Sequence, residues 1–310
     1  MPQSDRKALR LGTRGSKLAL AQSNMVRGHL EAAGIACEIT VVKTSGDRIQ
    51  DRTLADAGGK GLFTKELEEA LLSDRIDLAV HSMKDVPVEM PPGLALAAIL
   101  PREDPRDAFL SAKAKTLSEL PKGARLGTSS VRRTAQALRA RPDLDIALLR
   151  GNVDTRLRKL DEDEFDAILL AVAGLKRLGM AERITTPLET EEWLPALAQG
   201  AVGIEIREGD AQARAGVTPL NDPATAVALA CERAFQAALD GSCRTPIAGL
   251  AVYENGILKF RGEVIAPDGS DFAKAAFETT LGSDALSHAA DLGCETGMAI
   301  KPRAAKWLTL

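Results

Sequence analysis

The chain has 310 residues, about twice the usual length of a single domain, so two or three domains are expected, each with its own core. Forty Lys and Arg residues against forty-three Asp and Glu residues leave a net charge of −3. This balance excludes a global basic field for holding nucleic acid or an anionic membrane. Apolar residues make up 45% of the chain and charged residues 27%, a composition typical of an ordered globular protein.

The polar N-terminal segment does not resemble a signal peptide, and no stretch of the sequence is apolar over the length of a membrane span. These two features predict a cytoplasmic protein. The four cysteines, Cys37, Cys231, Cys243 and Cys294, are scattered singly, without the spacing of a zinc site or of a disulfide framework. Each is therefore either a small core residue or a reactive thiol, and no metal is expected.

Short apolar segments alternate with amphipathic segments over the first two thirds of the chain, which is typical of βα units and parallel sheets. Strands are predicted at residues 8–12, 38–43, 76–81, 94–100, 124–128, 145–150, 165–171 and 202–206. Between the strands, Phe63, Leu67 and Leu71 are predicted to share one helical face, and Val131, Ala135 and Leu138 to share another. Both helices are expected to be half buried.

The first two hundred residues contain an internal repeat. The strand end and turn at 11–16 are echoed at 126–130, and the strand at 77–80 is echoed at 166–169. In each copy, charged residues follow the carboxyl end of a strand, where open α/β sheets bind ligands, and Gly, Ser and Thr leave helix N–H groups to bind anions. Two similar α/β domains around a cleft are therefore expected, with a ligand that carries several negative charges.

Six arginines lie at the strand-to-helix junctions of the two copies: Arg14, Arg132, Arg133, Arg150, Arg156 and Arg177. Guanidinium groups suit carboxylates, which they bind through paired hydrogen bonds. Taken without this context, Arg132 and Arg133 are more simply explained as a solvated helix face. Asp85, next to Lys84, inverts the charge within this basic set, and it is either a surface ion pair or a carboxylate that stabilises a cation forming on the ligand.

The polar segment 46–61 ends in three glycines around Lys60. It lacks the glycine spacing of a P-loop and the Ser or Thr that follows the P-loop lysine, so nucleotide binding is disfavoured. A lid over the cleft is the preferred interpretation, and a plain surface loop is the alternative.

The pattern changes after about residue 220, and a small α+β third domain is predicted. A helix at 223–239 precedes the loop Gly241-Ser242-Cys243. A hairpin at 247–254 and 257–266 flanks Asn255-Gly256, a strong two-residue turn signal, and a final helix begins near Asp284. The thiol of Cys243, in a loop of small residues, is either a buried core group or a nucleophile.

These residues resemble the porphobilinogen deaminase family over nearly the whole chain. The resemblance is carried by the segments 11–16, 59–66, 77–87, 127–133, 150–157, 174–179, 199–205 and 241–243. It implies two domains similar to type II periplasmic binding proteins, residues 1–101 with 200–218 and residues 102–199, and a C-terminal domain at 219–310. Ser242, where many relatives have glycine, and the segment 196–200 depart from the family pattern only in loops.

The resemblance also implies an activity. The family joins four porphobilinogen molecules head to tail with release of ammonia, and hydrolysis then frees hydroxymethylbilane, the linear tetrapyrrole of heme biosynthesis. The implied protein is a monomeric transferase whose primer is a dipyrromethane cofactor held through a thioether at Cys243. Because porphobilinogen carries acetate and propionate groups, the growing chain accumulates carboxylates that suit an arginine-rich site.

The resemblance assigns roles residue by residue. Asp85 is the implied catalytic residue, and Lys60 belongs to the implied lid. The implied cofactor-binding residues are Cys243, Lys84, Thr128, Ser129, Ser130, Arg132, Arg133 and Arg150, and the implied substrate-binding residues are Arg14, Ser16, Arg150, Arg156 and Arg177.

Two other functions remain open from the sequence. A non-catalytic solute-binding or effector-binding protein is also built from two such domains around a cleft. A nucleotide-dependent transferase rests only on the run Gly58-Gly59-Lys60. No nucleic acid or membrane partner is expected.

Overall fold

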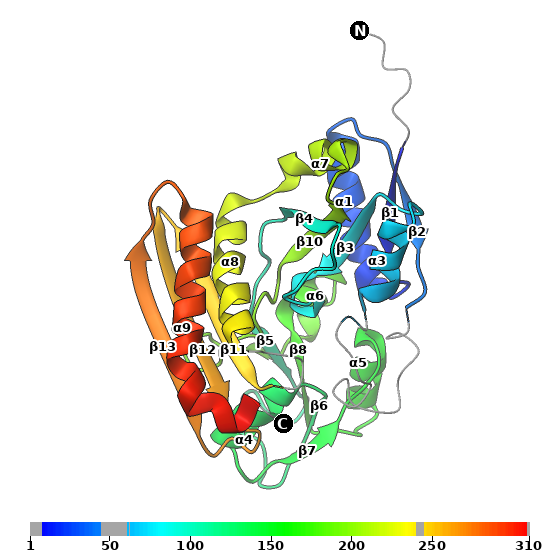
Figure 1. The fold of residues 1–310 in the computed structure, drawn as a ribbon. Helices are drawn as coiled ribbons and strands as arrows, with labels where there is room; N and C mark the ends of the chain where they lie inside the picture. Colours follow the sequence, from blue (N-terminus) through cyan, green and yellow to red (C-terminus); the bar gives the residue numbers. More distant parts are fainter. Residues whose placement is uncertain (1–7, 45–60, 62, 240–244, 309–310) are drawn as a thin grey trace. The chain divides into compact units, whose positions relative to one another are not determined.

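The computed structural model describes residues 8–44, 61, 63–239 and 245–308 (Figure 1). These residues fall into two compact units. Unit 1 comprises described residues up to 101 together with 201–223, and unit 2 comprises 102–200 with the described residues from 224 onward. The three-domain division and the cleft remain predictions.

Unit 1 is built on a five-stranded sheet with the strand order β2-β1-β3-β10-β4. Its elements are β1 (Leu9–Thr13), α1 (Lys17–Ala32), β2 (Cys37–Val41), α3 (Lys65–Leu72), β3 (Leu78–Ser82), β4 (Leu94–Ile99), β10 (Val202–Arg207) and α7 (Ala211–Val217). β1 pairs in parallel with β2 and β3, whereas β10 runs antiparallel between β3 and β4. The sheet is therefore mixed: the parallel pairing expected from the βα units is found for β1, β2 and β3, but not for β10 and β4.

Helices cover both faces of this sheet. Successive residues of a strand point to opposite faces, so Leu78 and Val80 of β3 pack with Leu30 of α1, while Ala79 packs with Leu67 of α3. With both faces occupied, the strand ends are the part of the sheet where polar side chains can gather.

Unit 2 contains a second five-stranded sheet, with the order β7-β6-β8-β5-β9. Its elements are β5 (Asp107–Leu110), β6 (Arg125–Thr128), α4 (Val131–Ala140), β7 (Asp145–Leu148), α5 (Val153–Asp161), β8 (Ala167–Ala171), α6 (Val172–Arg177) and β9 (Thr186–Pro187). β6 is parallel to β7 and β8, and β5 is antiparallel to β8 and β9. The two sheets thus share one spatial order and the same strand directions, although the inner antiparallel strand comes last along the chain in unit 1 and first in unit 2. The two similar α/β folds predicted from the repeat are confirmed.

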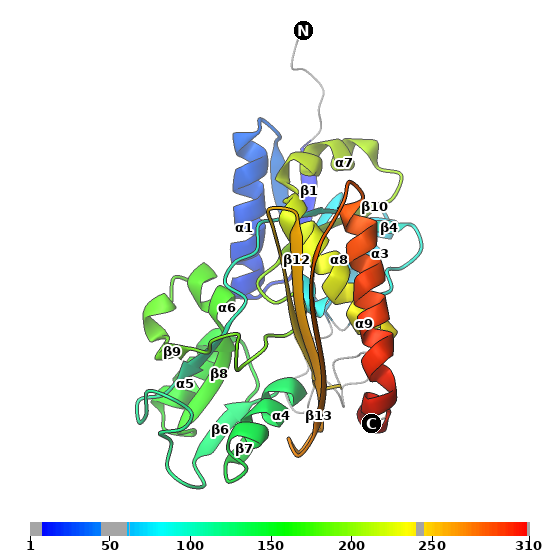
Figure 2. The ribbon, with the colours of Figure 1, turned by 90° about the vertical axis from the view of Figure 1, so that its left-hand side faces the viewer.

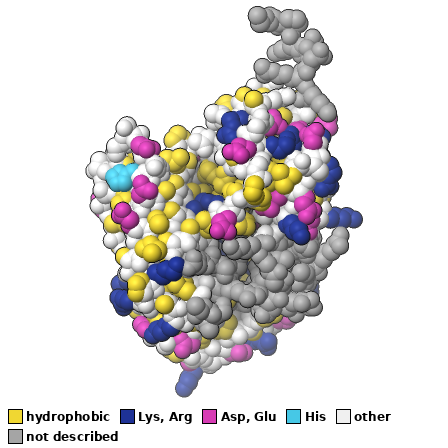
Figure 3. Space-filling view, viewed as in Figure 1, with side chains coloured by type: hydrophobic (Ala, Val, Ile, Leu, Met, Phe, Trp, Pro, Cys, Tyr) yellow, Lys and Arg dark blue, Asp and Glu magenta, His cyan; other side chains and the backbone are white. Residues whose placement is uncertain are grey.

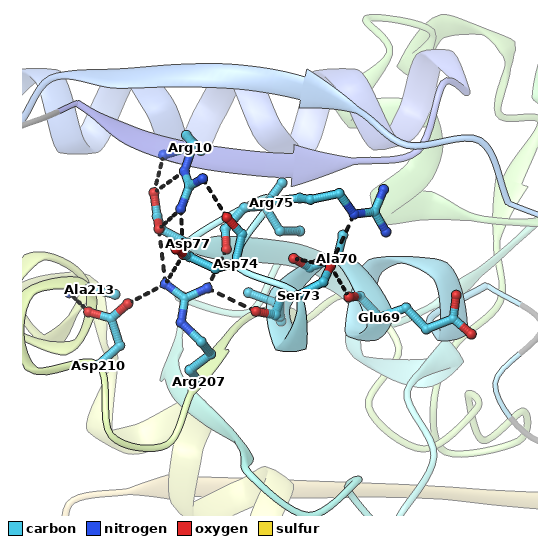
Figure 4. A network of polar contacts seen from close by, with 12 residues as sticks. Arg10, Glu69, Ala70, Ser73, Asp74, Arg75, Asp77, Arg207, Asp210 and Ala213 are labelled. Carbon is cyan, nitrogen blue, oxygen red and sulfur yellow. Dashed lines mark hydrogen bonds and ion pairs between the residues drawn. The ribbon is translucent and has the colours of Figure 1, made fainter.

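The repeat extends to individual hydrogen bonds at the amino ends of the central strands. The Arg10 N–H donates to Asp77 Oδ2 at 2.8 Å, and the Arg125 N–H donates to Asp166 Oδ2 at 2.7 Å. In unit 1 the guanidinium groups of Arg10 and Arg207 also bind Asp77, each with one Nη2 to Oδ1 contact, at 2.7 and 3.0 Å (Figure 4). Asp77 is therefore a carboxylate held between two arginines, at the end of the sheet opposite to Lys84 and Asp85.

A three-stranded antiparallel sheet, β11-β12-β13, completes unit 2. Its elements are α8 (Pro223–Ala238), β11 (Ile247–Glu254), β12 (Ile257–Ile265), β13 (Phe272–Thr280) and α9 (Ala285–Leu308). α8 and α9 lie side by side against this sheet (Figures 1 and 2), and the rings of Phe235 and Phe260 meet edge to face at 4.9 Å. The predicted hairpin is confirmed, because Asn255 and Gly256 both have positive φ angles, 52° and 80°. β13 was not predicted.

The surface in Figure 3 carries Lys and Arg side chains dispersed among acidic and hydrophobic ones. No helix in the described part of the chain is both long and apolar enough to cross a membrane.

We predict that Asp77→Asn destabilises the protein in a pH-dependent way. Burial alone would raise the pKa of Asp77, but the hydrogen bonds from Arg10 and Arg207 hold this pKa well below its usual range. Loss of these charge-assisted bonds should lower the free energy of unfolding by about 1.5–3 kcal/mol near neutral pH.

A carboxyl whose pKa is lower in the folded than in the unfolded state contributes stability that is present above the ordinary Asp pKa of about 3.9 and is lost as the pH falls toward the folded value. The difference between wild type and variant in urea unfolding should therefore shrink below about pH 4. A difference that stayed constant down to about pH 3 would contradict this account.

Candidate active site

Four of the predicted site residues lie at one edge of the unit 1 sheet. Because β1 and β3 are parallel neighbours, their carboxyl ends meet at the same edge. Arg14 follows β1, and the Oγ of Ser16 caps α1 by accepting a hydrogen bond from the Ala19 N–H at 3.3 Å. Lys84 and Asp85 lie in the short helix η1 (Met83–Asp85), directly after β3. These four residues therefore lie after the carboxyl ends of neighbouring parallel strands, as predicted.

The turn that carries Lys84 and Asp85 is anchored on both sides. Gln22 of α1 donates from Nε2 to Ser82 Oγ at 2.8 Å, and the Met83 N–H donates to the carbonyl of Ala201 at 3.0 Å. Asp85 itself is half-buried. These contacts fix the backbone from which the predicted catalytic carboxylate projects.

The guanidinium of Arg14 lies over the ring of Phe63, 4.0 Å from its centroid. Such a cation–π contact orients the planar group without using its N–H donors. Lys60 of the predicted lid and Cys243 of the predicted attachment loop lie outside the described residues.

A buried pair next to this edge was missed by the sequence analysis. His81 of β3 and Glu205 of β10 are both buried, and His81 Nε2 lies 2.9 Å from Glu205 Oε2. Burial and, further, the charge of Glu205 raise the pKa of Glu68 on α3. The only signal in the sequence was a polar residue within each of two otherwise apolar strands.

In unit 2 the predicted hydroxyl residues link β6 to α4. Thr128 Oγ1 accepts a hydrogen bond from the Ser130 N–H at 3.1 Å. Ser130 is the N-cap of α4, and its Oγ accepts from the Arg133 N–H at 3.4 Å. Ser129 lies between them, so the segment presents three hydroxyl groups at the start of a helix, where anions are favoured.

Arg150 and Arg156 flank a glycine turn after β7, and the Arg156 side chain folds back onto that turn. Asn152 caps α5 by accepting a hydrogen bond from the Thr155 N–H at 2.9 Å, and Arg156 Nε donates to the Gly151 carbonyl at 2.9 Å. Gly151 has a φ of +108°, and a Cβ at this position would lie 2.8 Å from the Cβ of Thr155. Only glycine fits this turn, since both the backbone angle and the close approach exclude a side chain.

Arg177 lies at the end of α6, where its Nη2 donates to the Gly200 carbonyl at 2.6 Å. Burial lowers the pKa of its guanidinium. Its neighbour Lys176 forms an ion pair with Glu103 at 2.9 Å. One guanidinium nitrogen of Arg177 is thus already bound to a backbone carbonyl of unit 2.

Arg132 and Arg133 do not form a solvated helix face, and that alternative was wrong. Their exposed fractions are 4% and 6%, and both bind the fully buried Asp107 of β5. Arg132 Nη1 lies 2.8 Å from Asp107 Oδ2, and Arg133 Nη2 lies 2.7 Å from Oδ1. Burial alone would raise the pKa of Asp107, but the two arginines hold this pKa well below its usual range.

This cluster contains two guanidinium groups against one carboxylate, so it keeps an excess of positive charge. Burial lowers the pKa of Arg132, and its Nε is buried with no hydrogen-bond partner in the part of the chain that the structure describes. Buried donors are rarely left unpaired. Together with the hydroxyl groups of 128–130, the unpaired N–H fits a ligand that carries carboxylates.

Among the described residues, no group of three or more His, Cys, Asp and Glu side chains is placed to hold a metal ion.

We predict that Gly151→Ala destabilises unit 2 more than Gly179→Ala does. Both glycines have positive φ angles, but an added Cβ at Gly179 meets no atom within 4 Å, whereas at Gly151 it meets Thr155. Backbone strain should cost about 1 kcal/mol at Gly179, and strain together with crowding about 2–4 kcal/mol at Gly151. Urea unfolding of the two variants measures the difference, and equal losses would show that the contact with Thr155 is unimportant.

Two known family models match the chain. Residues 9–215 match the model described as "Porphobilinogen deaminase, dipyromethane cofactor binding domain". Residues 226–301 match the model described as "Porphobilinogen deaminase, C-terminal domain". The two matches together cover most of the chain.

Curated proteins and solved structures are also similar to the chain. The porphobilinogen deaminase of Nitrobacter hamburgensis is 53% identical over 305 residues, which cover 97% of this chain and 95% of that protein. The porphobilinogen deaminase of Nitrobacter winogradskyi is 52% identical with the same coverage. Among solved structures, the methionine-binding protein MetQ is 13% identical with a TM-score of 0.45, covering 69% of this chain and 89% of its own. The family matches and the identity along nearly the full length show that the chain belongs to the porphobilinogen deaminase family.

Proposed function

We propose that the chain is a hydroxymethylbilane synthase, a transferase that joins four porphobilinogen molecules head to tail with release of ammonia and then frees the linear tetrapyrrole by hydrolysis. Membership of the family supports this function. The observation that supports it most is the buried cluster around Asp107, whose excess positive charge and unpaired Arg132 Nε suit an anionic ligand. The carboxylates of a polypyrrole provide such a ligand.

The proposed cofactor is a dipyrromethane joined through a thioether to Cys243. When bound, it supplies the pyrrole carbon to which the first porphobilinogen is joined. We propose that its carboxylates are held by Lys84, Thr128, Ser129, Ser130, Arg132, Arg133 and Arg150. The donor set fits this group, since it combines guanidinium forks, hydroxyl groups and the N-terminus of a ten-residue helix.

The proposed substrate-binding residues are Arg14, Ser16, Arg150, Arg156 and Arg177, with Lys60 in a lid. Porphobilinogen carries an acetate and a propionate group, and each can pair with a guanidinium through two hydrogen bonds. The turn at Gly151 supports this role, because the guanidinium of Arg156 is held against the carbonyl of Gly151, the residue after Arg150.

Asp85 is the proposed catalytic residue. Release of ammonia from the substrate leaves positive charge on the pyrrole, and a carboxylate near the pyrrole nitrogen stabilises that charge. At about 4 Å and an effective dielectric constant of about 20, the attraction is about 4 kcal/mol before desolvation is subtracted. The anchored turn after β3 supports this role, because a fixed carboxylate does not need to reorganise during the reaction.

The alternative functions are not favoured. A solute-binding or effector-binding protein would have no need of a thiol-bound primer, and the relatives along nearly the full length of the chain are named as deaminases. A nucleotide-dependent transferase rested on Gly58-Gly59-Lys60, which lie outside the described residues. We further propose the domain division 1–101 with 200–218, 102–199 and 219–310, a monomer, and a cytoplasmic location suited to tetrapyrrole biosynthesis.

The covalent cofactor is tested by intact-mass measurement. Purified protein should weigh more than its sequence by two porphobilinogen units less two ammonia molecules, because each unit is joined with loss of one ammonia. Cys243→Ser should abolish this increment, whereas Cys294→Ser, at an exposed cysteine elsewhere in unit 2, should retain it. An active protein of unmodified mass would exclude the covalent primer.

The catalytic role of Asp85 is tested by Asp85→Asn, which keeps the shape and one acceptor of the side chain but removes its charge. Turnover should fall by about a hundredfold or more, the scale for losing one preorganised electrostatic group. Substrate affinity should change far less, because the substrate carboxylates bind arginines.

The measurement is single-turnover release of ammonia from Asp85→Asn protein whose cofactor loading has been verified by mass. Glu89→Gln, an exposed acid four residues along the chain, is the matched control and should release ammonia at the wild-type rate. Near-normal release from the Asp85 variant would assign the charge-stabilising role to another residue.

A further inference from the structure

The carboxylate of Asp107 is bound on both oxygens by side chains of unit 2. Oδ1 accepts hydrogen bonds from Arg133 Nη2 at 2.7 Å, from Arg133 Nε at 3.2 Å and from Gln199 Nε2 at 2.9 Å. Oδ2 accepts from Trp193 Nε1 at 2.8 Å and lies 2.8 Å from Arg132 Nη1. Asp107 is itself fully buried. A carboxylate with donors on both oxygens has one orientation, so it holds its partners in one orientation as well.

The two neighbouring arginines differ in what remains available on them. The third nitrogen of Arg133, Nη1, donates to the Leu169 carbonyl at 2.9 Å, so all three nitrogens of Arg133 are bound within the protein. Arg132 Nη1 donates to Gln136 Oε1 at 2.7 Å, while Arg132 Nε is the buried donor without a partner among the described residues. Each nitrogen of Arg133 therefore has a partner within the protein, whereas the Nε of Arg132 has none among the described residues.

Arg132 is also held from the side of the C-terminal sheet. Gln136, which accepts from Arg132, donates from Nε2 to Glu263 Oε1 of β12 at 3.3 Å. Glu263 in turn binds Arg139 of α4 at 2.7 Å. The guanidinium of Arg132 is thus held between Asp107 of β5 and Gln136 of α4, and Gln136 is in turn held by Glu263 of β12.

We propose that Asp107 is a positioning residue for cofactor loading: it fixes the guanidinium of Arg132 so that Nε is ready for a carboxylate of the incoming polypyrrole. This inference rests on the proposed function. It goes beyond it, because Asp107 carries the same charge as the ligand and does not bind it. One carboxylate against two guanidinium groups leaves a net positive charge for the ligand. The position of the Asp107 carboxylate determines where the unpaired Nε of Arg132 lies.

The test uses variants that change the position or the charge of this carboxylate. Asp107→Glu keeps the charge and moves the carboxylate by one methylene, and Asp107→Asn removes the charge. Because the Asn variant leaves two buried guanidinium groups uncompensated and is expected to unfold easily, the Glu variant decides the test. Asp77→Asn is the matched control. Asp77 also lies between two arginines, but in unit 1 and at the end of the sheet away from Lys84 and Asp85 (Figure 4).

Each protein is produced in cells that cannot make porphobilinogen and is then mixed with increasing porphobilinogen. The covalent mass increase is followed over time, and the thermal midpoint is measured before and after loading. The half-saturating porphobilinogen concentration should rise by at least about tenfold for Asp107→Glu, the scale of one charge-assisted hydrogen bond. It should stay at the wild-type value for Asp77→Asn, although that variant is less stable.

The rise in thermal midpoint on loading provides a second readout that a purely structural role would not change. It should be present in wild type and in Asp77→Asn, and reduced in Asp107→Glu. Wild-type loading behaviour in Asp107→Glu would overturn the positioning role, and so would an equal defect in Asp77→Asn, which would indicate a general loss of stability. Failure of the wild-type protein itself to gain mass would overturn the proposed function instead.

Discussion

The ion pairs of Asp107 are the constraint on which the rest of unit 2 depends. A carboxylate and two guanidinium groups are removed from water together, and such groups are tolerated in a core only when each finds a partner. Their partners come from distant parts of the sequence: Asp107 from β5, Arg132 and Arg133 from α4, and Trp193 and Gln199 from the segment that leads back to unit 1. Satisfying one buried charge therefore ties together the sheet, the helix that presents hydroxyl groups, and the chain between the units.

Different polar groups lie at the two ends of each sheet. At the amino ends, Asp77 and Asp166 bind the backbone N–H groups of Arg10 and Arg125, and these contacts hold neighbouring strands in register. At the carboxyl ends, Asp85 and the hydroxyl groups of 128–130 sit on anchored turns or helix caps. In unit 1 the ion pairs of Asp77 thus lie at the end of the sheet opposite to Asp85, whereas in unit 2 the ion pairs of Asp107 include Arg132 and Arg133, which are themselves proposed cofactor-binding residues.

Local signals predicted much of this fold, and non-local pairing accounts for what they missed. The alternation of apolar strands and amphipathic helices was sufficient for the two similar sheets, and Asn255-Gly256 specified a hairpin turn because both residues tolerate positive φ. β10 was predicted as a strand of a parallel sheet but runs antiparallel to its neighbours, since strand direction depends on a partner far away in the chain. β5, which is antiparallel to β8 and β9, was not predicted as a strand. β9 has only two residues and β13 joins an existing hairpin, so neither carried a sequence pattern of its own.

The sequence by itself determined the kinds of groups at the site: arginines and hydroxyl residues after strand ends, one acid beside Lys84, and a thiol in a loop of small residues. The spacing of these groups along the chain is a local property, and it was sufficient to indicate the family. Only the tertiary structure decided that Arg132 and Arg133 are buried, that each nitrogen of Arg133 donates a hydrogen bond within the protein, and that Arg132 keeps an Nε without a partner among the described residues. The physical reason is that burial and charge compensation depend on groups brought together from β5, α4 and β12, and no pattern within one segment records which partner will face a given side chain.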